Sequence, residues 1–172
     1  AFFSDIQQAP QTHALGLQGE HTFRFPTFFF SSNCTMAGFL CPLASLKKIT
    51  ADTEFQPLTV MPGKGMLVAS FYQHRQVDEM QPYDEVVLSI PVFRRNQWLP
   101  PLLPLLAPKP LRSFGHLILD MPVNSELNRL RGNLLWNLPK SSADIDISSL
   151  PSRSSLQVNG EGLNLSLDVE IR

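Results

Sequence analysis

The sequence predicts a mainly β domain with one or two short helices. Fifteen prolines in 172 residues argue against a helical bundle, because each proline removes a backbone donor and fixes φ. Several segments alternate apolar and polar residues, as half-buried strands do. In the last of them, residues 163–171, the alternation follows the pair Asn159-Gly160, which favours a hairpin turn. These observations predict antiparallel strands that form a barrel or a sandwich.

Strands are predicted where aromatic, β-branched or alternating apolar residues lie between turn signals. Residues 85–93 (EVVLSIPVF) fit this description best. Pro26 is expected to bend or end the first strand, because proline is tolerated only at strand edges, ends and bulges. The predicted strands are residues 21–30, 36–40, 65–72, 85–93, 116–121 and 145–147, and the two strands of the hairpin in residues 156–171.

Two short helices are also predicted. Residues 42–49 place leucine and isoleucine at helical spacing, with two lysines facing away. Residues 124–131 are expected to form the second helix, with Asn124 as its N-cap and Gly132 as its stop.

The length suits a single domain with a sizeable core. Residues 1–20 are polar without a clear period, so they are interpreted as an N-terminal arm, and the domain is expected to span residues 21–172. Residues 99–110 (LPPLLPLLAPKP) are too rich in proline for a helix or a central strand. We expect a loop packed on the body, with docking to another subunit as the alternative. An oligomer or a larger assembly is therefore expected.

Composition narrows the range of partners. A net charge of −1 gives no electrostatic reason to expect nucleic acid, and Pro, Lys and Arg interrupt every apolar stretch that could span a membrane. Two cysteines without a histidine cluster make a weak zinc site, so no metal or cofactor is expected. We favour a soluble, cytoplasmic protein. Glycosylation sequons at Asn33 and Asn164, and a chain that starts at Ala1, leave secretion or an organelle after processing open.

Lys140 is the first candidate for chemistry. It follows Pro139 in LLWNLPK, and its immediate neighbours are apolar or neutral. Burial disfavours the ammonium form and lowers the pKa of a lysine, and a neutral amine can attack a carbonyl to form a Schiff base. A lone lysine at a strand end is usually exposed, so Lys140 alone does not decide between an exposed side chain and a buried, reactive amine.

Two short blocks resemble the acetoacetate decarboxylase family. Residues 83–85 (Tyr-Asp-Glu) and 90–92 (Ile-Pro-Val) are similar to the family's tyrosine–any–glutamate and Ile-Pro-Val pattern. Residues 132–140 (GNLLWNLPK) resemble its glycine-to-lysine segment, with the same spacing from glycine to Pro-Lys. The resemblance covers roughly residues 20–170.

The resemblance implies an antiparallel β-cone or barrel around an apolar cavity, and a lysine that forms an imine with a keto acid. Lys140 then becomes the nucleophile, and Glu85 becomes the carboxylate that orients the substrate or moves protons. Arg24, Tyr83 and Trp136 are expected to contact the substrate. Activation of a lysine by desolvation or a nearby cation is known from acetoacetate decarboxylase itself.

Three positions depart from the family pattern. Ser141 stands where a second lysine is expected, and Pro26 stands where the alignment places a first-strand arginine, two residues from Arg24. Asn133-Leu134 replaces the Arg-Glu that usually follows the glycine. Losing a cation near the substrate weakens binding of an anionic keto acid.

Three functions therefore compete. The first is a Schiff-base-forming, decarboxylase-like lyase acting on a small keto acid. The second is a non-catalytic barrel that binds a small apolar ligand, with Lys140 and Glu85 as a structural ion pair. The third is an interaction subunit that docks through residues 99–110. His74, between Tyr72 and Arg75, is expected to be exposed or hydrogen-bonded, with a place in the pocket lining as the alternative.

Overall fold

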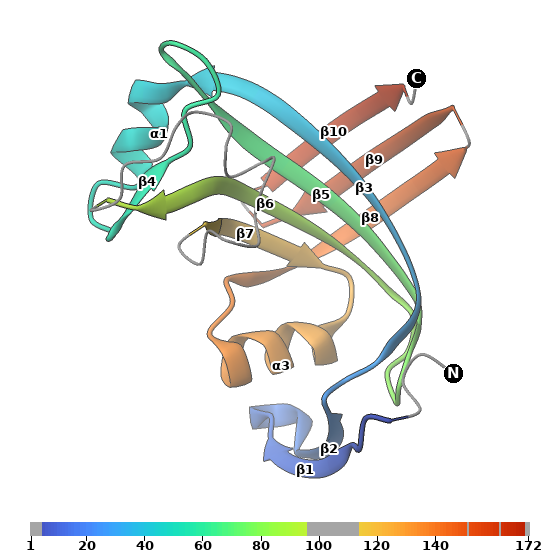
Figure 1. The fold of residues 1–172 in the computed structure, drawn as a ribbon. Helices are drawn as coiled ribbons and strands as arrows, with labels where there is room; N and C mark the ends of the chain where they lie inside the picture. Colours follow the sequence, from blue (N-terminus) through green and yellow to red (C-terminus); the bar gives the residue numbers. More distant parts are fainter. Residues whose placement is uncertain (1–4, 96–113, 151, 162, 171–172) are drawn as a thin grey trace. The chain divides into compact units, whose positions relative to one another are not determined.

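The computed structural model describes the chain except residues 1–4, 96–113, 151, 162 and 171–172. The described residues are mostly strand with little helix, so the predicted fold class is confirmed (Figure 1). The strands are β1 (Ala9–Ala14), β2 (Glu20–Phe25), β3 (Phe29–Pro42), β4 (Phe55–Pro57), β5 (Lys64–Val77), β6 (Tyr83–Arg94), β7 (Gly115–Val123), β8 (Lys140–Leu150), β9 (Arg153–Gly160) and β10 (Leu163–Glu170). The helices are α1 (Leu43–Ile49), α3 (Glu126–Trp136) and the 3-10 turn η1 (Gly16–Gln18).

The strands form two sheets. β1 and β2 pair with each other, and the larger sheet has the order β10-β9-β8-β7-β6-β5-β3, with β4 paired to β6. One pair in the larger sheet is parallel: Met121 of β7 lies opposite Lys140, the first residue of β8. Parallel strands need a crossover connection, and α3 supplies it.

By their internal contacts, the residues group into two compact units. The first unit comprises residues 1–35, 71–86 and 121–172, and the second comprises residues 36–70 and 87–120. In the second unit, α1 packs so closely on β5 that a Cβ built on Gly65 would lie 2.6 Å from Cδ1 of Leu46. Its core is formed by Leu46, Ile90 and Val92, with Cys41, Phe55, Leu67, Leu117 and Leu119 around them.

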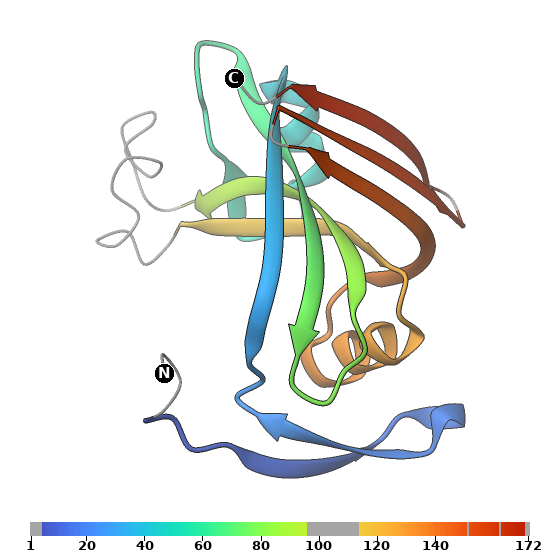
Figure 2. The same ribbon diagram turned by 90° about the vertical axis from the view of Figure 1, so that its right-hand side faces the viewer.

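In the first unit, β8, β9 and β10 lie side by side as an antiparallel set (Figure 2). The predicted final hairpin is present, but its turn is not at Asn159-Gly160. Both residues belong to β9, where Asn159 pairs with Asn164 and Gly160 pairs with Leu163. The turn falls later because β8 also pairs with these residues, Ala143 lying opposite Gly160.

The second predicted helix is shifted toward the C-terminus. Ser125, not Asn124, is the N-cap, and its hydroxyl accepts from the backbone N of Asn128 at 3.3 Å. Asn124 has another role, because its side chain accepts from the backbone N of Asp84 at 2.8 Å. Gly132 lies inside the helix, which ends at Trp136 before Asn137 in the left-handed conformation (φ 51°).

The N-terminal region contains more structure than its polar sequence indicated. Residues 9–14 form β1, whose Ala9 lies opposite Phe25 of β2. The prediction that Pro26 ends the first strand is confirmed, since β2 ends at Phe25 and β3 begins at Phe29. The proline-leucine segment, residues 99–110, lies outside the described residues. In the described part of the chain, no helix has the length and apolar character that a membrane crossing requires.

Candidate functional site

The connection from α3 to β8 holds the backbone of Lys140 in place. The backbone N of Leu138 donates to the carbonyl of Gly132 at 3.1 Å, which turns the chain back along the helix. The side chain of Asn133 then brackets Lys140: its Oδ1 accepts from the Lys140 backbone N at 3.0 Å, and its Nδ2 donates to the Lys140 carbonyl at 3.1 Å. Because both groups of one amide are used, this contact fixes the lysine backbone relative to α3.

The side chain of Lys140 crosses α3 at Gly132. A Cβ built at Gly132 would lie 2.5 Å from Cδ and 2.6 Å from Cε of Lys140, so the lysine stem crosses the helix where a side chain is missing. The spacing from Gly132 to Lys140 therefore has a direct physical meaning. Only glycine lets the lysine reach inward across α3 at this point.

The amine of Lys140 is buried and paired. Its side chain is 6% exposed, and Nζ donates to Oε2 of Glu85 and to Oδ1 of Asn128. Glu85 lies on β6, and its side chain is 10% exposed. A carboxylate, an amide and an amine thus meet at one point, from β6, α3 and β8 respectively.

Tyr83 extends this group. It lies two residues before Glu85 on β6, so both side chains project from the same face of the strand. Its hydroxyl is hydrogen-bonded to Asn128. Burial raises the pKa of Tyr83, and the charge of Glu85 raises it further, so the phenol stays protonated.

The pKa of Lys140 is lowered from its ordinary value. Burial is the main cause, and the nearby charge of Arg131 acts in the same direction. Glu85 opposes them through its charge and its hydrogen bond, but the net direction is downward. The site therefore favours the neutral amine more than water does.

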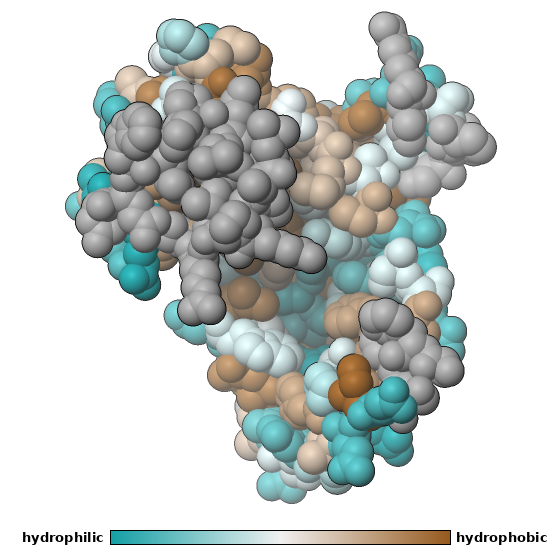
Figure 3. Space-filling model, viewed as in Figure 1, coloured by the Kyte–Doolittle hydropathy of each residue, from teal (hydrophilic) through white to brown (hydrophobic). Residues whose placement is uncertain are grey.

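A cavity of about 500 Å³ opens beside these residues, entirely within the first unit. Its wall is mostly apolar and includes several aromatic side chains, with charged and amide groups gathered around Lys140. Over α3, β1 and β2, the surface in Figure 3 carries both hydrophilic and hydrophobic side chains. The lining residues are Phe25, Pro26, Thr27, Phe29, Tyr72, His74, Tyr83, Glu85, Met121, Asn128, Arg131, Gly132, Trp136, Leu138 and Lys140.

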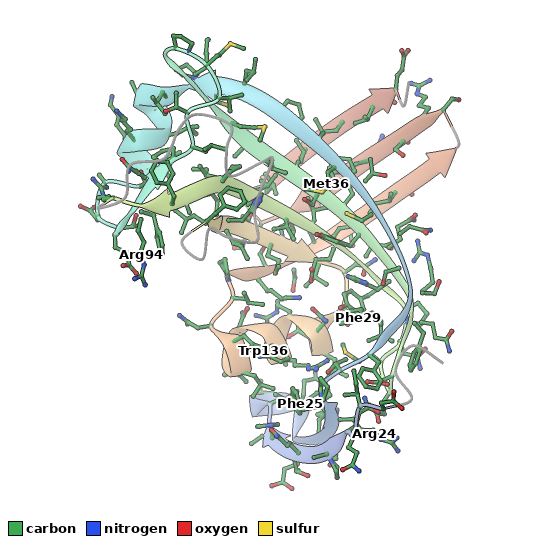
Figure 4. The ribbon with its side chains drawn as sticks, viewed as in Figure 1. Arg24, Phe25, Phe29, Met36, Arg94 and Trp136 are labelled. Carbon is green, nitrogen blue, oxygen red and sulfur yellow. The ribbon has the colours of Figure 1, made fainter. Side chains whose placement is uncertain are left out.

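Four of the five predicted site residues line the cavity, and one does not. Lys140, Glu85, Tyr83 and Trp136 all line the cavity. Arg24 does not: its side chain is 61% exposed and forms an ion pair with a surface glutamate at 2.8 Å. The expectation that Arg24 contacts the substrate is therefore corrected. Side chains alternate along a strand, so Phe23 and Phe25 of β2 face α3 while Arg24 faces away. In Figure 4, Phe25 lies near Trp136, and Arg24 lies farther from Trp136 than Phe25 does.

His74 lines the cavity and is also hydrogen-bonded, so the alternative position considered from the sequence is the one observed. It is buried on β5, and its Nδ1 is 2.8 Å from the hydroxyl of Ser32. Its ring stacks on Tyr72 at 5.5 Å and lies 4.7 Å from the ring of Tyr83. Burial lowers the pKa of His74 to about 4, and the positive charge of Lys140 contributes, so the imidazole is neutral at pH 7. The period-two spacing of Tyr72 and His74 was the available signal for a shared face.

Asn128 and Arg131 were missed. Both are buried polar residues of α3, on the turns that face the cavity. Their separation of three residues places them on one side of the helix, and Lys140 approaches that side. The sequence signal was a polar pair inside a short helix, which is more often a solvated face. Among the described residues, no cluster of His, Cys, Asp and Glu is arranged to hold a metal ion.

Comparison with known proteins agrees with this architecture. No family model and no curated protein matches the sequence. A solved structure of an acetoacetate decarboxylase from Legionella pneumophila is similar to this chain, with a TM-score of 0.59 at 11% identity over 81% of its residues. The chain therefore has an acetoacetate decarboxylase-like β fold, and at this identity the similarity concerns the fold alone.

The two proteins differ in extent. The similar region covers 47% of the Legionella protein, so this chain spans about half of its length. The activity named for that protein is considered for this chain only as a proposal.

Proposed function

We propose that this protein is a Schiff-base-forming enzyme that acts on a small keto acid, with Lys140 as the nucleophile. The observation that carries the proposal is the buried amine of Lys140, which lies in a mostly apolar cavity and has a pKa below its ordinary value. A lysine in such surroundings yields the neutral amine that attacks a carbonyl.

The chemistry follows from that amine. Neutral Nζ attacks the carbonyl carbon to give a carbinolamine, and a proton delivered to its hydroxyl group lets water leave as the iminium ion forms. In a β-keto acid, the bond to the carboxylate then breaks, its electron pair moves to the iminium nitrogen, and carbon dioxide leaves as the enamine forms. Protonation of the enamine carbon followed by hydrolysis releases a ketone and restores the amine.

Glu85 and Asn128 are assigned supporting roles. Glu85 contacts Nζ directly, so it is placed to take the ammonium proton and to return protons during water loss. Asn128 accepts from the same Nζ and aims the amine into the cavity. The protonated phenol of Tyr83 is a further donor for the substrate oxygen.

One observation favours the alternative of a non-catalytic binding cavity. Nζ of Lys140 and Oε2 of Glu85 form a direct ion pair, which stabilises the ammonium form. In this case the pair is structural, and the aromatic wall binds a small apolar ligand without reaction. Glu85 raises the pKa of Lys140, while burial and Arg131 lower it. The enzyme requires burial and Arg131 to dominate, so that the amine is neutral, whereas the binding cavity requires Glu85 to dominate.

Reductive trapping separates the two functions. The protein is incubated with pyruvate, acetoacetate or levulinate and borohydride, and adducts are mapped by mass spectrometry. We expect a reduced imine at Lys140, none in Lys140→Ala, and native labelling in Lys64→Ala, which removes an exposed lysine of the second unit. Native protein that stays folded yet unlabelled with every keto acid would favour the binding cavity.

A further inference from the structure

A second cation lines the same cavity. Arg131 is 3% exposed, and it belongs to α3, one residue before the glycine that Lys140 crosses. In the proposed catalysis, Arg131 lowers the pKa of Lys140 through its charge, but it is assigned no contact with the substrate. A guanidinium that is removed from water loses a large hydration energy, so its surroundings have to be accounted for.

The hydrogen-bond partners of Arg131 are neutral. Nη1 donates to Sδ of Met80 at 2.9 Å, and Nη2 donates to the hydroxyl of Thr27. Nε is buried and has no hydrogen-bond partner within the described residues. Asp78 and Glu79 influence Arg131 only through charge, and neither forms an ion pair with it in the described part of the chain.

Aromatic rings surround the guanidinium on its other sides. Its Cζ lies 4.7 Å from the ring centre of Phe23, 4.8 Å from that of Trp136 and 5.3 Å from that of Phe25. Ring faces attract a cation, but they do not satisfy N–H donors or neutralise a full charge. The charge of Arg131 is therefore only partly compensated by the protein, and burial lowers its pKa accordingly.

An anion in the cavity would complete this environment. A carboxylate accepts from guanidinium donors in a planar, charge-assisted arrangement that the thioether of Met80 and the hydroxyl of Thr27 do not match. Lys140 and Arg131 line one cavity, so one ligand can meet both. Phe25 and the half-exposed Trp136 lie at the cavity and over the guanidinium, where they screen this contact from water.

We propose that Arg131 binds the carboxylate of the cavity's ligand and thereby selects keto acids over neutral ketones. This inference rests on the proposed function, because it assumes that the ligand's carbonyl group meets Lys140. Arg131 acts here as a specificity-determining residue, from α3, while the exposed Arg24 of β2 takes no part.

The test compares ligands with and without a carboxylate. Borohydride trapping at Lys140 is measured with pyruvate, levulinate and 5-oxohexanoate, whose two groups are increasingly far apart, and with the neutral ketone 2-butanone. We expect native protein to be labelled by at least one keto acid at concentrations about tenfold or more below that needed for 2-butanone. In Arg131→Met this preference should disappear. The matched variant Arg129→Met, on the same helix but outside this cavity, should keep it.

The two proposals fail in different ways. Native-like preference in a folded Arg131→Met variant would overturn the role of Arg131 and leave Schiff-base chemistry intact. If neither ligand class labels Lys140, the proposed function fails. The role of Arg131 is then tested by comparing the melting temperature of the protein with pentanoate and with pentanamide. Only pentanoate, the anion, should stabilise native protein. If Arg131→Met does not fold, the same melting comparison decides, and equal effects of the two compounds would refute anion binding.

Discussion

Replacing Gly132 with alanine tests the path of the lysine across α3. The new Cβ would lie 2.5 Å from Cδ and 2.6 Å from Cε of Lys140, whereas carbon atoms in contact are ordinarily about 3.5–4.0 Å apart. The lysine stem must therefore move by about 1 Å. Its amine is anchored by Glu85 and Asn128, so the movement strains or breaks those contacts.

The expected magnitude comes from two opposing effects. Alanine in a helix interior is favoured over glycine by about 1 kcal/mol. Overpacking a filled site costs about 1–3 kcal/mol, and weakening a buried ion pair adds to that cost. We expect Gly132→Ala to lower the free energy of unfolding by about 1–2 kcal/mol and to reduce imine trapping at Lys140.

Urea unfolding followed by circular dichroism measures the first effect. Leu134→Ala is the control, because Leu134 is exposed on the same helix and its replacement should leave trapping at Lys140 unchanged. Should Gly132→Ala be more stable than native protein, as an ordinary helical glycine predicts, the lysine does not cross the helix at this position. That outcome would also remove the structural reason for the Gly-to-Lys spacing.

Other substitutions test the surroundings of the amine. Glu85→Gln removes the group that raises the pKa of Lys140, so the midpoint of the lysine titration, followed by NMR of its ε-carbon, should fall; a rise would contradict the assigned charges. His74 has a folded pKa of about 4, below its ordinary value of 6.5, so its contribution to stability is present above pH 6.5 and is lost as the pH falls toward 4. Urea unfolding should show a loss of up to about 3 kcal/mol over this range, and His74→Gln should flatten the profile. Asn133→Ala should lower the free energy of unfolding by about 1–2 kcal/mol and slow imine trapping, because it removes two hydrogen bonds to the backbone of Lys140. Trapping at the native rate would show that these hydrogen bonds are not needed to position the lysine.

Local sequence patterns were sufficient for most individual elements. Helix α1 covers all but the first of residues 42–49, and β6 contains the predicted strand 85–93. These predictions succeeded because residue spacing and proline positions act within a few residues. Asn124 shows where such patterns fail: a good N-cap residue serves the backbone of β6 instead, and Ser125 caps the helix.

The candidate site was predictable only where a motif pointed to it. The short blocks around Glu85 and Lys140 identified both residues, and the structure places Nζ of Lys140 against Oε2 of Glu85. No local pattern revealed that Asn128 would share that amine, or that burial would lower the pKa of His74 to about 4. These contacts join residues far apart in the chain, so they depend on how strands and helix pack.

By itself, the sequence determined the mainly β character of the chain, and its resemblance to a known family named Lys140 and Glu85 as the candidates for chemistry. The burial and direct pairing of these two residues came from the structure. Tertiary structure alone decided which arginine lines the cavity. Arg24 was chosen from its strand position, yet alternation along β2 turns it outward to an ion pair with Glu79. Arg131 is buried because α3 packs its guanidinium against Phe23, and a cation becomes significant only once the fold has removed it from water.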